Sequence, residues 1–116
     1  MWRDLHVRVY PGIQHMFAIP NGAYLQGDKR RRAMQWAKLK RQGAKEGVSD
    51  IFLPVARNGY HGLWIELKST REYRPRVSDD QRNWISSMNG EGYLAVVSYG
   101  FDEAVAVIRD YYSGRR

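Results

Sequence analysis

The chain has 116 residues, of which 43% are hydrophobic and 27% are charged, as expected for one globular domain spanning residues 1–116. It contains no cysteine, which excludes disulfides, thiolate metal sites and cysteine catalysis. No apolar run approaches the roughly 18 residues of a membrane helix, and the start lacks the apolar stretch of a signal peptide, so we expect a cytoplasmic protein. The net charge of +7 favours a polyanionic partner such as nucleic acid.

The first part of the sequence predicts one exposed helix. A short apolar run over residues 15–19 ends at a turn over residues 20–22. A helix is then predicted over residues 29–42, with Asp28 as its N-cap and Gly43 as its stop. Its apolar stripe is thin and most of its side chains are Arg, Lys or Gln, so we expect much of it to face water or an anion.

The middle of the chain predicts a β-hairpin. Residues 48–55 and 63–69 both have the composition of strands. The connection over residues 56–62 contains Asn58-Gly59, a frequent hairpin turn. We therefore expect these two strands to pair in antiparallel fashion.

The last part of the chain predicts a helix, a strand and a helix. After a polar, basic loop over residues 70–77, Ser78 caps a helix that ends near Met88. Residues 93–98 form the next predicted strand. The last helix is predicted from an amphipathic stripe made of Phe101, Ala104, Val105, Ile108, Tyr111 and Tyr112. The whole order is helix, strand, strand, helix, strand, helix, which is typical of an α/β layer architecture.

The second predicted strand carries two charged side chains on one face. Because side chains alternate along a strand, Leu63, Ile65 and Leu67 share one face, and Trp64, Glu66 and Lys68 share the other. Burying either charge alone is costly, so Glu66 and Lys68 should pair or bind a charged group. The alternative is a solvated face with a weak ion pair, which is common on half-exposed sheets.

Asp50 is the residue that the hairpin would bring to Glu66. It lies near the start of the first predicted strand, on the face opposite Ile51 and Leu53. Two neighbouring carboxylates repel each other unless they share a proton or a cation. Hard oxygen ligands of this kind suit Mg²⁺ or Mn²⁺.

Gln81 allows two interpretations. It falls on the inward stripe of its predicted helix, where a buried amide needs polar partners. It could therefore enter a polar pocket under the sheet. Alternatively, residues 78–81 read Ser-Asp-Asp-Gln, so Gln81 could complete a capping box with the backbone of Ser78.

These segments resemble a known nuclease family. The resemblance rests on residues 47–50 (Gly-Val-Ser-Asp), 65–68 (Ile-Glu-Leu-Lys) and 78–84 (Ser-Asp-Asp-Gln-Arg-Asn-Trp), together with residues 19–22 and 39–43. In this order they are similar to the VRR-NUC nucleases of the PD-(D/E)XK superfamily. The resemblance covers almost the whole chain. It implies an α/β fold with a restriction-endonuclease-like core, a small mixed sheet flanked by helices.

The resemblance also implies a function and a set of roles. The chain would be a metal-dependent endonuclease that hydrolyses DNA, with Mg²⁺ or Mn²⁺ held by Asp50, Glu66 and the main-chain carbonyl of Leu67. Lys68 would position or activate the attacking water, and Gln81 would be an accessory polar residue of the site. Stand-alone members look like homodimers, several acting on branched DNA such as four-way (Holliday) junctions. Many are encoded by bacteriophages, which suggests a phage origin and a bacterial or phage-infected host cell.

One feature departs from the family pattern. The first helix of the family usually carries an acidic residue that completes the site. Here little sequence precedes Pro11, and Asp4, the one early acidic residue, is not equated with that position. Either the start is truncated or the site functions without this residue. We expect the departure to affect metal affinity and turnover more than identity.

Several basic and polar residues are candidates for DNA contact. They are Asn21, Arg30, Arg31, Arg32, Lys38, Lys40, Arg41 and Lys45, together with Arg71 and Arg74 of the polar loop. The alternatives are a solvated helix for the basic residues and turn formation for Asn21. The three histidines lack metal-ligand spacing.

Two other functions stay open from the sequence. The chain could be a non-catalytic nucleic-acid-binding module that keeps the nuclease fold, which the absent early acidic residue favours. It could also be a structural or interaction protein whose charges are solvated. Salt-sensitive DNA binding would separate the last from the others, and metal-dependent cleavage would separate the nuclease from the binding module.

Overall fold

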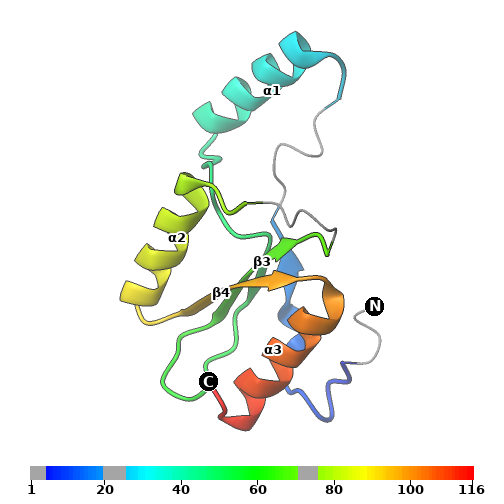
Figure 1. Cartoon of the computed structure of the whole chain (residues 1–116), viewed down its shortest axis with the longest axis vertical. Helices are drawn as coiled ribbons and strands as arrows, with labels where there is room; N and C mark the ends of the chain where they lie inside the picture. Colours follow the sequence, from blue (N-terminus) through cyan, green and yellow to red (C-terminus); the bar gives the residue numbers. More distant parts are fainter. Residues whose placement is uncertain (1–4, 20–25, 71–75) are drawn as a thin grey trace.

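The protein folds around a small mixed β-sheet with helices on both sides (Figure 1). The computed structural model describes residues 5–19, 26–70 and 76–116. Its elements are the 3-10 helix η2 (Ile13–His15), β1 (Phe17–Ala18), α1 (Lys29–Arg41), β2 (Ile51–Leu53), β3 (Leu63–Lys68), α2 (Asp79–Gly90), β4 (Leu94–Tyr99) and α3 (Phe101–Ser113). The strands lie in the order β1-β2-β3-β4; only β3 and β4 are parallel. The predicted small mixed sheet flanked by helices is confirmed.

The predicted hairpin between β2 and β3 is confirmed. Ile51 pairs with Ile65, and the turn is made by Asn58 and Gly59, which both have positive φ angles of 53° and 86°. Positive φ at both central residues is the geometry that matches the twist of a two-stranded ribbon. The hairpin therefore fixes which residues of β2 and β3 face each other.

Strand β2 is shorter than the eight residues predicted over 48–55. At one end, Pro54 has no N–H and cannot continue the backbone ladder. At the other end, the Leu67 N–H donates to the side chain of Asp50, to Oδ2 at 2.8 Å. A side-chain oxygen thus takes the place of a backbone carbonyl, and the backbone pairing of β2 with β3 stops here. The Asp50 carbonyl accepts instead from the Ile19 N–H of the neighbouring edge, at 2.7 Å.

Strand β1 was missing from the predicted order. Its residues lie within the apolar run 15–19, which was too short to assign, and Phe17 pairs with Phe52 of β2. The turn predicted over residues 20–22 and most of the basic loop, residues 71–75, lie outside the described residues. No described helix is long and apolar enough to cross a membrane.

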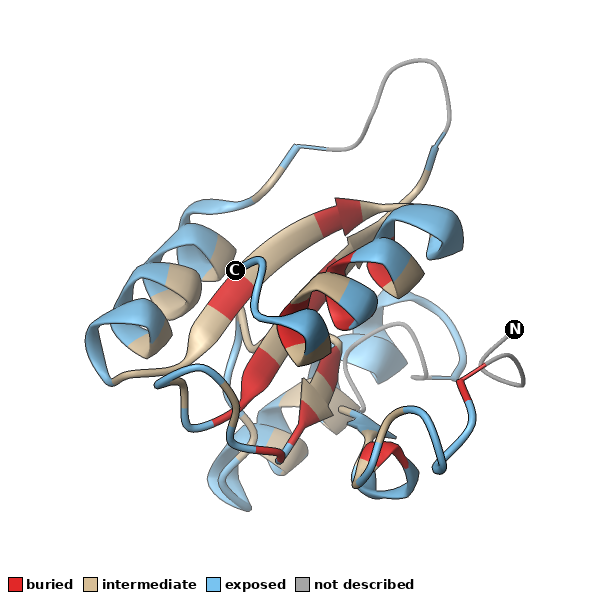
Figure 2. Cartoon of the chain, turned by 90° about the horizontal axis from the view of Figure 1, so that it is seen from below, coloured by how far each residue is buried: buried red, intermediate tan, exposed pale blue. Residues whose placement is uncertain are grey.

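The two faces of the sheet are covered by different helices. Helix α3 packs on one face, where Leu63 and Ile65 of β3 and Tyr111 of α3 are fully buried. The Tyr111 hydroxyl is satisfied there by donating to the Val55 carbonyl at 2.6 Å. Figure 2 shows that the buried residues concentrate in the strands and along the inner side of α3.

Helix α2 covers the β3 and β4 half of the other face. Trp84 of α2 meets Trp64 of β3 edge to face, with ring centroids 5.2 Å apart. The predicted inward stripe of this helix is confirmed, because its partly buried side chains are Gln81, Trp84, Ile85 and Met88, although none is fully buried. Among the described elements, α2 makes no comparable contact with β1 or β2, whereas Ile51 and Leu53 of β2 are buried in the core on the α3 side.

The predicted stripe of α3 needs one correction. Ala104, Ile108 and Tyr111 are buried as predicted, and Val107 is buried as well. Phe101, however, is 43% exposed. It is the first residue of α3 and lies where β3 and β4 end, where it lines a pocket with Lys68 and Thr70.

Helix α1 stands apart from the sheet, as Figure 1 shows. It begins at Lys29 as predicted and ends at Arg41, one residue before the predicted end, and Asp28 caps it by accepting from the Arg31 N–H at 2.9 Å. None of its residues is buried. It is tied to the following loop by Glu46, which accepts from Trp36 Nε1 at 2.8 Å and forms an ion pair with Lys40 at 3.2 Å. The expectation that much of this helix faces solvent is confirmed.

Candidate active site

The hairpin brings Asp50 and Glu66 together. Asp50 immediately precedes β2, and the pairing of Ile51 with Ile65 places Asp50 opposite Glu66. The hydrogen bond from the Leu67 N–H to Asp50 Oδ2 fixes the first carboxylate at this position. The sequence prediction that the two carboxyl groups lie side by side is therefore correct in geometry.

Glu66 is a buried carboxyl group. It is only 2% exposed, and among the described residues its Oε2 has no hydrogen-bond partner. Burial, reinforced by a hydrogen bond and by the charge of Asp50, raises the pKa of Glu66 to about 8, while the nearby Lys68 acts in the opposite direction. At neutral pH, without a cation, this group is therefore mostly protonated.

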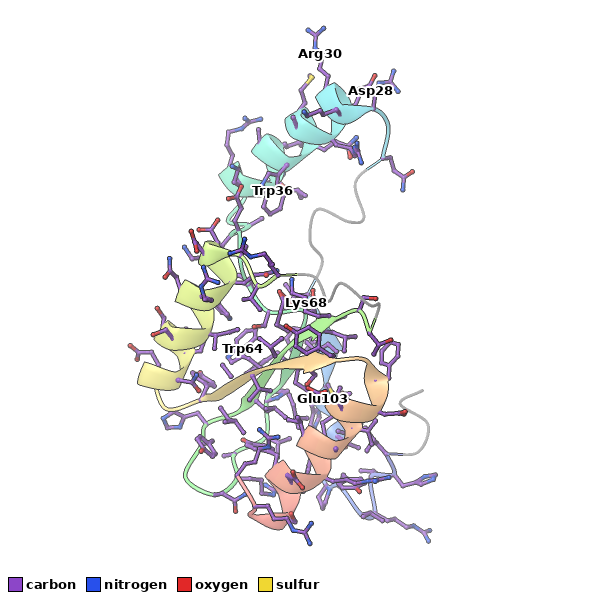
Figure 3. All side chains as sticks on the ribbon, in the orientation of Figure 1. Asp28, Arg30, Trp36, Trp64, Lys68 and Glu103 are labelled. Carbon is purple, nitrogen blue, oxygen red and sulfur yellow. The ribbon has the colours of Figure 1, made fainter. Side chains whose placement is uncertain are left out.

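Gln81 completes the predicted capping box and also contacts Lys68. Its Oε1 accepts from the Ser78 N–H at 2.9 Å, while the Gln81 N–H donates to Ser78 Oγ at 3.2 Å, which completes a capping box. The same Oε1 also accepts from Lys68 Nζ at 2.8 Å. Figure 3 shows Lys68 at the end of the sheet nearest α1 and Trp64 further along the same strand.

The first turn of α2 is thereby held against the carboxylate pair. Gly47, three residues before Asp50, has a φ of 86°, and a Cβ added there would lie 2.5 Å from the Asp80 carbonyl. Only glycine permits so close an approach of two backbones with this φ. The loop that carries Asp50 and the helix that carries Gln81 are therefore packed directly on each other.

The backbone of Leu67 faces the carboxylates. The carbonyls of Gly62 and Lys68 accept hydrogen bonds from Leu94 and Gly100, on the β4 side. In a strand, alternate residues direct both backbone polar groups to the same edge. Leu67, whose N–H donates to Asp50, therefore has its carbonyl on the Asp50 side as well.

The chain matches the VRR-NUC domain family over residues 17–102, a range that includes the whole Asp50, Glu66, Lys68 and Gln81 arrangement. It belongs to the VRR-NUC family. A solved structure described as a VRR_NUC domain protein is 31% identical, superposes with a TM-score of 0.70, and is aligned over 89% of this chain and 71% of that chain. A search of curated proteins found no matching relative. Because VRR-NUC is a nuclease-type family, a nuclease-like function follows.

The predicted DNA contacts of this VRR-NUC domain are only partly within the described residues. The described ones are exposed, and they are Arg30, Arg31, Arg32, Lys38, Lys40 and Arg41 of α1, with Lys45 just after it. Figure 3 shows Arg30 at the far end of α1, directed away from the sheet. Asn21, Arg71, Arg74 and the early acidic residue Asp4 lie outside the described residues.

The carboxylate pair has no third acidic partner in the described part of the chain. Within residues 5–19, 26–70 and 76–116, no group of three His, Cys, Asp or Glu side chains could hold a metal ion. Asp50 and Glu66 are therefore the acidic side chains that come together at this site among the described residues.

Sequence reasoning missed the aromatic side chains beside this site. Phe17 and Phe52 lie next to the carboxylates on the same sheet face. Phe52 could have been predicted, because it lies two residues after Asp50 and side chains two residues apart on a strand share a face. Phe17 could be placed only once β1 was known to pair with β2.

We predict that Glu66 makes the stability of the protein depend on pH. The unfolded chain loses the Glu66 proton near pH 4.5 and the folded protein near pH 8, so the folded state binds more protons between these values. The free energy of unfolding therefore falls as the pH rises through this window. Glu66→Gln cannot ionise, so its Tm should rise relative to wild type between pH 5 and pH 8 in EDTA. Parallel Tm curves for the two proteins would contradict this.

Proposed function

We propose that this chain is a metal-dependent deoxyribonuclease that hydrolyses phosphodiester bonds. The observation that carries the proposal is the Asp50 and Glu66 pair, with Lys68 held beside it by Gln81. Membership of a nuclease-type family supports it. A buried carboxyl group beside a half-buried one, next to an oriented amine, has no evident use in the packing of the domain. Apolar side chains would fill the same space at a lower cost.

The residues present fit a hard divalent cation such as Mg²⁺ or Mn²⁺. The Glu66 oxygen that lacks a hydrogen-bond partner among the described residues lies beside a second carboxylate. Carboxylate and carbonyl oxygens are the ligands that these ions prefer. Asp50, Glu66 and the Leu67 carbonyl would hold the ion. When bound, it would neutralise charge on the phosphate and lower the pKa of a coordinated water.

The reaction would be the hydrolysis of a phosphodiester. The oxygen of water forms a bond to phosphorus, the bond from phosphorus to the 3′ oxygen breaks, and that oxygen takes up a proton. The products are a 5′-phosphate and a 3′-hydroxyl. The Lys68 ammonium adds fixed positive charge where negative charge develops, and Gln81 Oε1 keeps it in place.

The substrate would be bound largely through its backbone. Helix α1 has seven basic residues and no acidic one, and it projects into solvent where a duplex could reach it. We include Asn21, Lys45, Arg71 and Arg74 in this proposed contact surface. A DNA strand bound in this way would reach the carboxylates over β1 and β2, the part of this sheet face that α2 does not cover.

We further propose branched DNA, such as four-way junctions, as the preferred substrate and a homodimer as the active form. A two-fold dimer would present two sites at a fixed spacing, which matches the symmetry of a junction. The resemblance noted in the sequence supports both points, and we place the protein in the cytoplasm of a bacterial or phage-infected cell.

A second function is favoured by one observation. The described part of the chain lacks a third acidic ligand, which would suit a nucleic-acid-binding module that keeps the nuclease fold without turnover. The two functions differ in a simple way. Both predict DNA binding, but only the nuclease predicts metal-dependent cleavage.

The proposal predicts different effects for the two kinds of site residue. We expect wild type to cut at least one of a labelled junction, flap, duplex and single strand with Mg²⁺ or Mn²⁺, and not in EDTA. Asp50→Ala should abolish cleavage while DNA binding in a gel-shift assay is kept. Lys68→Ala should lower turnover far more than affinity, because it acts on charge that develops during reaction.

Two results would decide against this assignment. Binding without cleavage by wild type, under every metal condition, would leave the binding module as the function. Equal losses of binding and turnover in both variants would show that Asp50 and Lys68 hold the fold or the DNA and do not assist the reaction.

The proposed role of α1 predicts a change in salt dependence. Changing Arg30, Arg32 and Lys38 to Gln keeps good helix formers and should lower the slope of log affinity against log salt by about 0.9 for each lost phosphate contact. The matched control changes Arg8, Arg109 and Arg115 to Gln, three exposed residues of the N-terminal segment and the α3 end. Equal slope changes in the two triple variants would show a general charge effect without a role for α1.

A further inference from the structure

A row of aromatic side chains crosses the sheet next to the carboxylates. Phe17 of β1 pairs with Phe52 of β2, which pairs with Trp64 of β3. The Phe52 and Trp64 rings are stacked, with centroids 4.1 Å apart, and Phe17 meets Phe52 edge to face at 5.9 Å. The three rings therefore form one continuous surface.

This aromatic row and the carboxylate pair share one face of the sheet. Side chains two residues apart on a strand point the same way, so Phe52 lies on the Asp50 side of β2 and Trp64 on the Glu66 side of β3. The Ile19 N–H donates to the Asp50 carbonyl, so the pairing of β1 with β2 extends one residue further and places Ile19 opposite Asp50. From ideal strand spacings, the Phe17 backbone lies about 8 Å from that of Asp50.

The end of the row at Phe17 is open. Trp84 of α2 covers Trp64, whereas Phe17 is 50% exposed on a two-residue edge strand. Other exposed large apolar side chains of the described residues lie outside the strands: Val7 and Val9 in the N-terminal segment, Met34 on α1, and Phe101 at the start of α3, where it lines a pocket with Lys68. Among the described strand residues, Phe17 is thus the exposed large ring on the carboxylate face of the sheet.

We propose that Phe17 is a stacking platform for an unpaired nucleobase of the strand whose phosphodiester lies at Asp50 and Glu66. The proposal rests on the proposed function and deepens it, because it names DNA with unpaired nucleotides beside the cleaved bond as the substrate class. An aromatic ring stacks on any base, at about 1–3 kcal/mol for each base. Bases inside a paired duplex are already stacked on their neighbours and do not offer a free face.

The charge of the protein favours a nucleic acid over an apolar protein segment as the occupant. The chain carries a net charge of +7, and the basic helix α1 lies at the same end of the sheet as Lys68 (Figure 3). Phe17 pairs at the level of Trp64, four residues along β3 from Lys68 and on the same face of the sheet. An aromatic platform combined with positive charge is how proteins bind single strands without sequence preference. A protein partner would remain an outcome of the test, since it would leave DNA affinity independent of the ring.

The test compares four residues at position 17 in the full chain carrying Asp50→Ala. The probe is a single-stranded oligonucleotide with 2-aminopurine, whose fluorescence falls when the base stacks. We expect quenching with Phe17 and with Phe17→Trp, and its loss with Phe17→Leu and Phe17→Ala. Affinity for the single strand should fall by about 5- to 150-fold in the last two, while affinity for the paired duplex of the same sequence stays unchanged.

Phe17→Leu and Val9→Ala are the controls that keep the test decisive. Leucine keeps apolar contact with Phe52 without an aromatic face, so a folded Leu variant that loses quenching separates stacking from packing. Val9 is 65% exposed and lines a pocket with the C-terminal half of α3, so its change to Ala should leave quenching and DNA affinity unchanged. Folding of each variant is checked by its thermal transition.

The outcomes distinguish the two proposals. Quenching that persists in Phe17→Leu, or equal losses for single strand and duplex, would overturn the platform whether or not the wild type cuts DNA. Quenching that depends on the ring, in a protein whose wild type cuts no DNA, would support the platform and reject the nuclease.

Discussion

A carboxyl group buried in a protein must be protonated, hydrogen-bonded or bound to a cation. This requirement applies to Glu66, and the residues packed around it determine how it is met. The hairpin register sets Asp50 opposite it, and burial together with Asp50 raises its pKa to about 8. Without a cation, two neighbouring carboxyl groups do not stabilise the sheet, because they repel each other when both are ionised. A site that takes up a divalent cation gains two ligands that are already in place, and it releases a proton when the cation binds.

The same contacts that stabilise the fold also orient the site. The capping box of α2 uses Gln81 Oε1 to accept from Ser78, and that oxygen also accepts from Lys68. Gly47 allows the Asp50 loop to pack directly on the start of α2, so the position of this helix fixes the position of the loop that carries Asp50. A substitution of Gln81 that breaks the α2 capping box would therefore also remove the hydrogen bond that holds the Lys68 ammonium in place.

Local signals were enough to predict much of this arrangement. The caps at Asp28 and Ser78, the Asn58-Gly59 turn and the alternation along β3 each depend on residues close in sequence, and together they placed both carboxyl groups. The rest depends on contacts between distant segments. Strand β1 is two residues long and exists only because β2 offers its edge, so neither it nor the exposed ring of Phe17 could be placed. Phe101 was predicted to be buried because it falls on the apolar stripe of α3, and the spacing of a stripe does not show where the sheet beneath the helix ends.

The central claim is that the Glu66 carboxyl group exchanges its proton for a divalent cation. It is tested most directly by calorimetric titration of Mn²⁺ into the protein at pH 7, in two buffers with different heats of ionisation. Since the pKa of Glu66 is about 8, we expect binding to release about one proton for each ion, and the release to fall towards zero well above pH 8. Binding with no proton release at pH 7, or no binding at all, would contradict the claim.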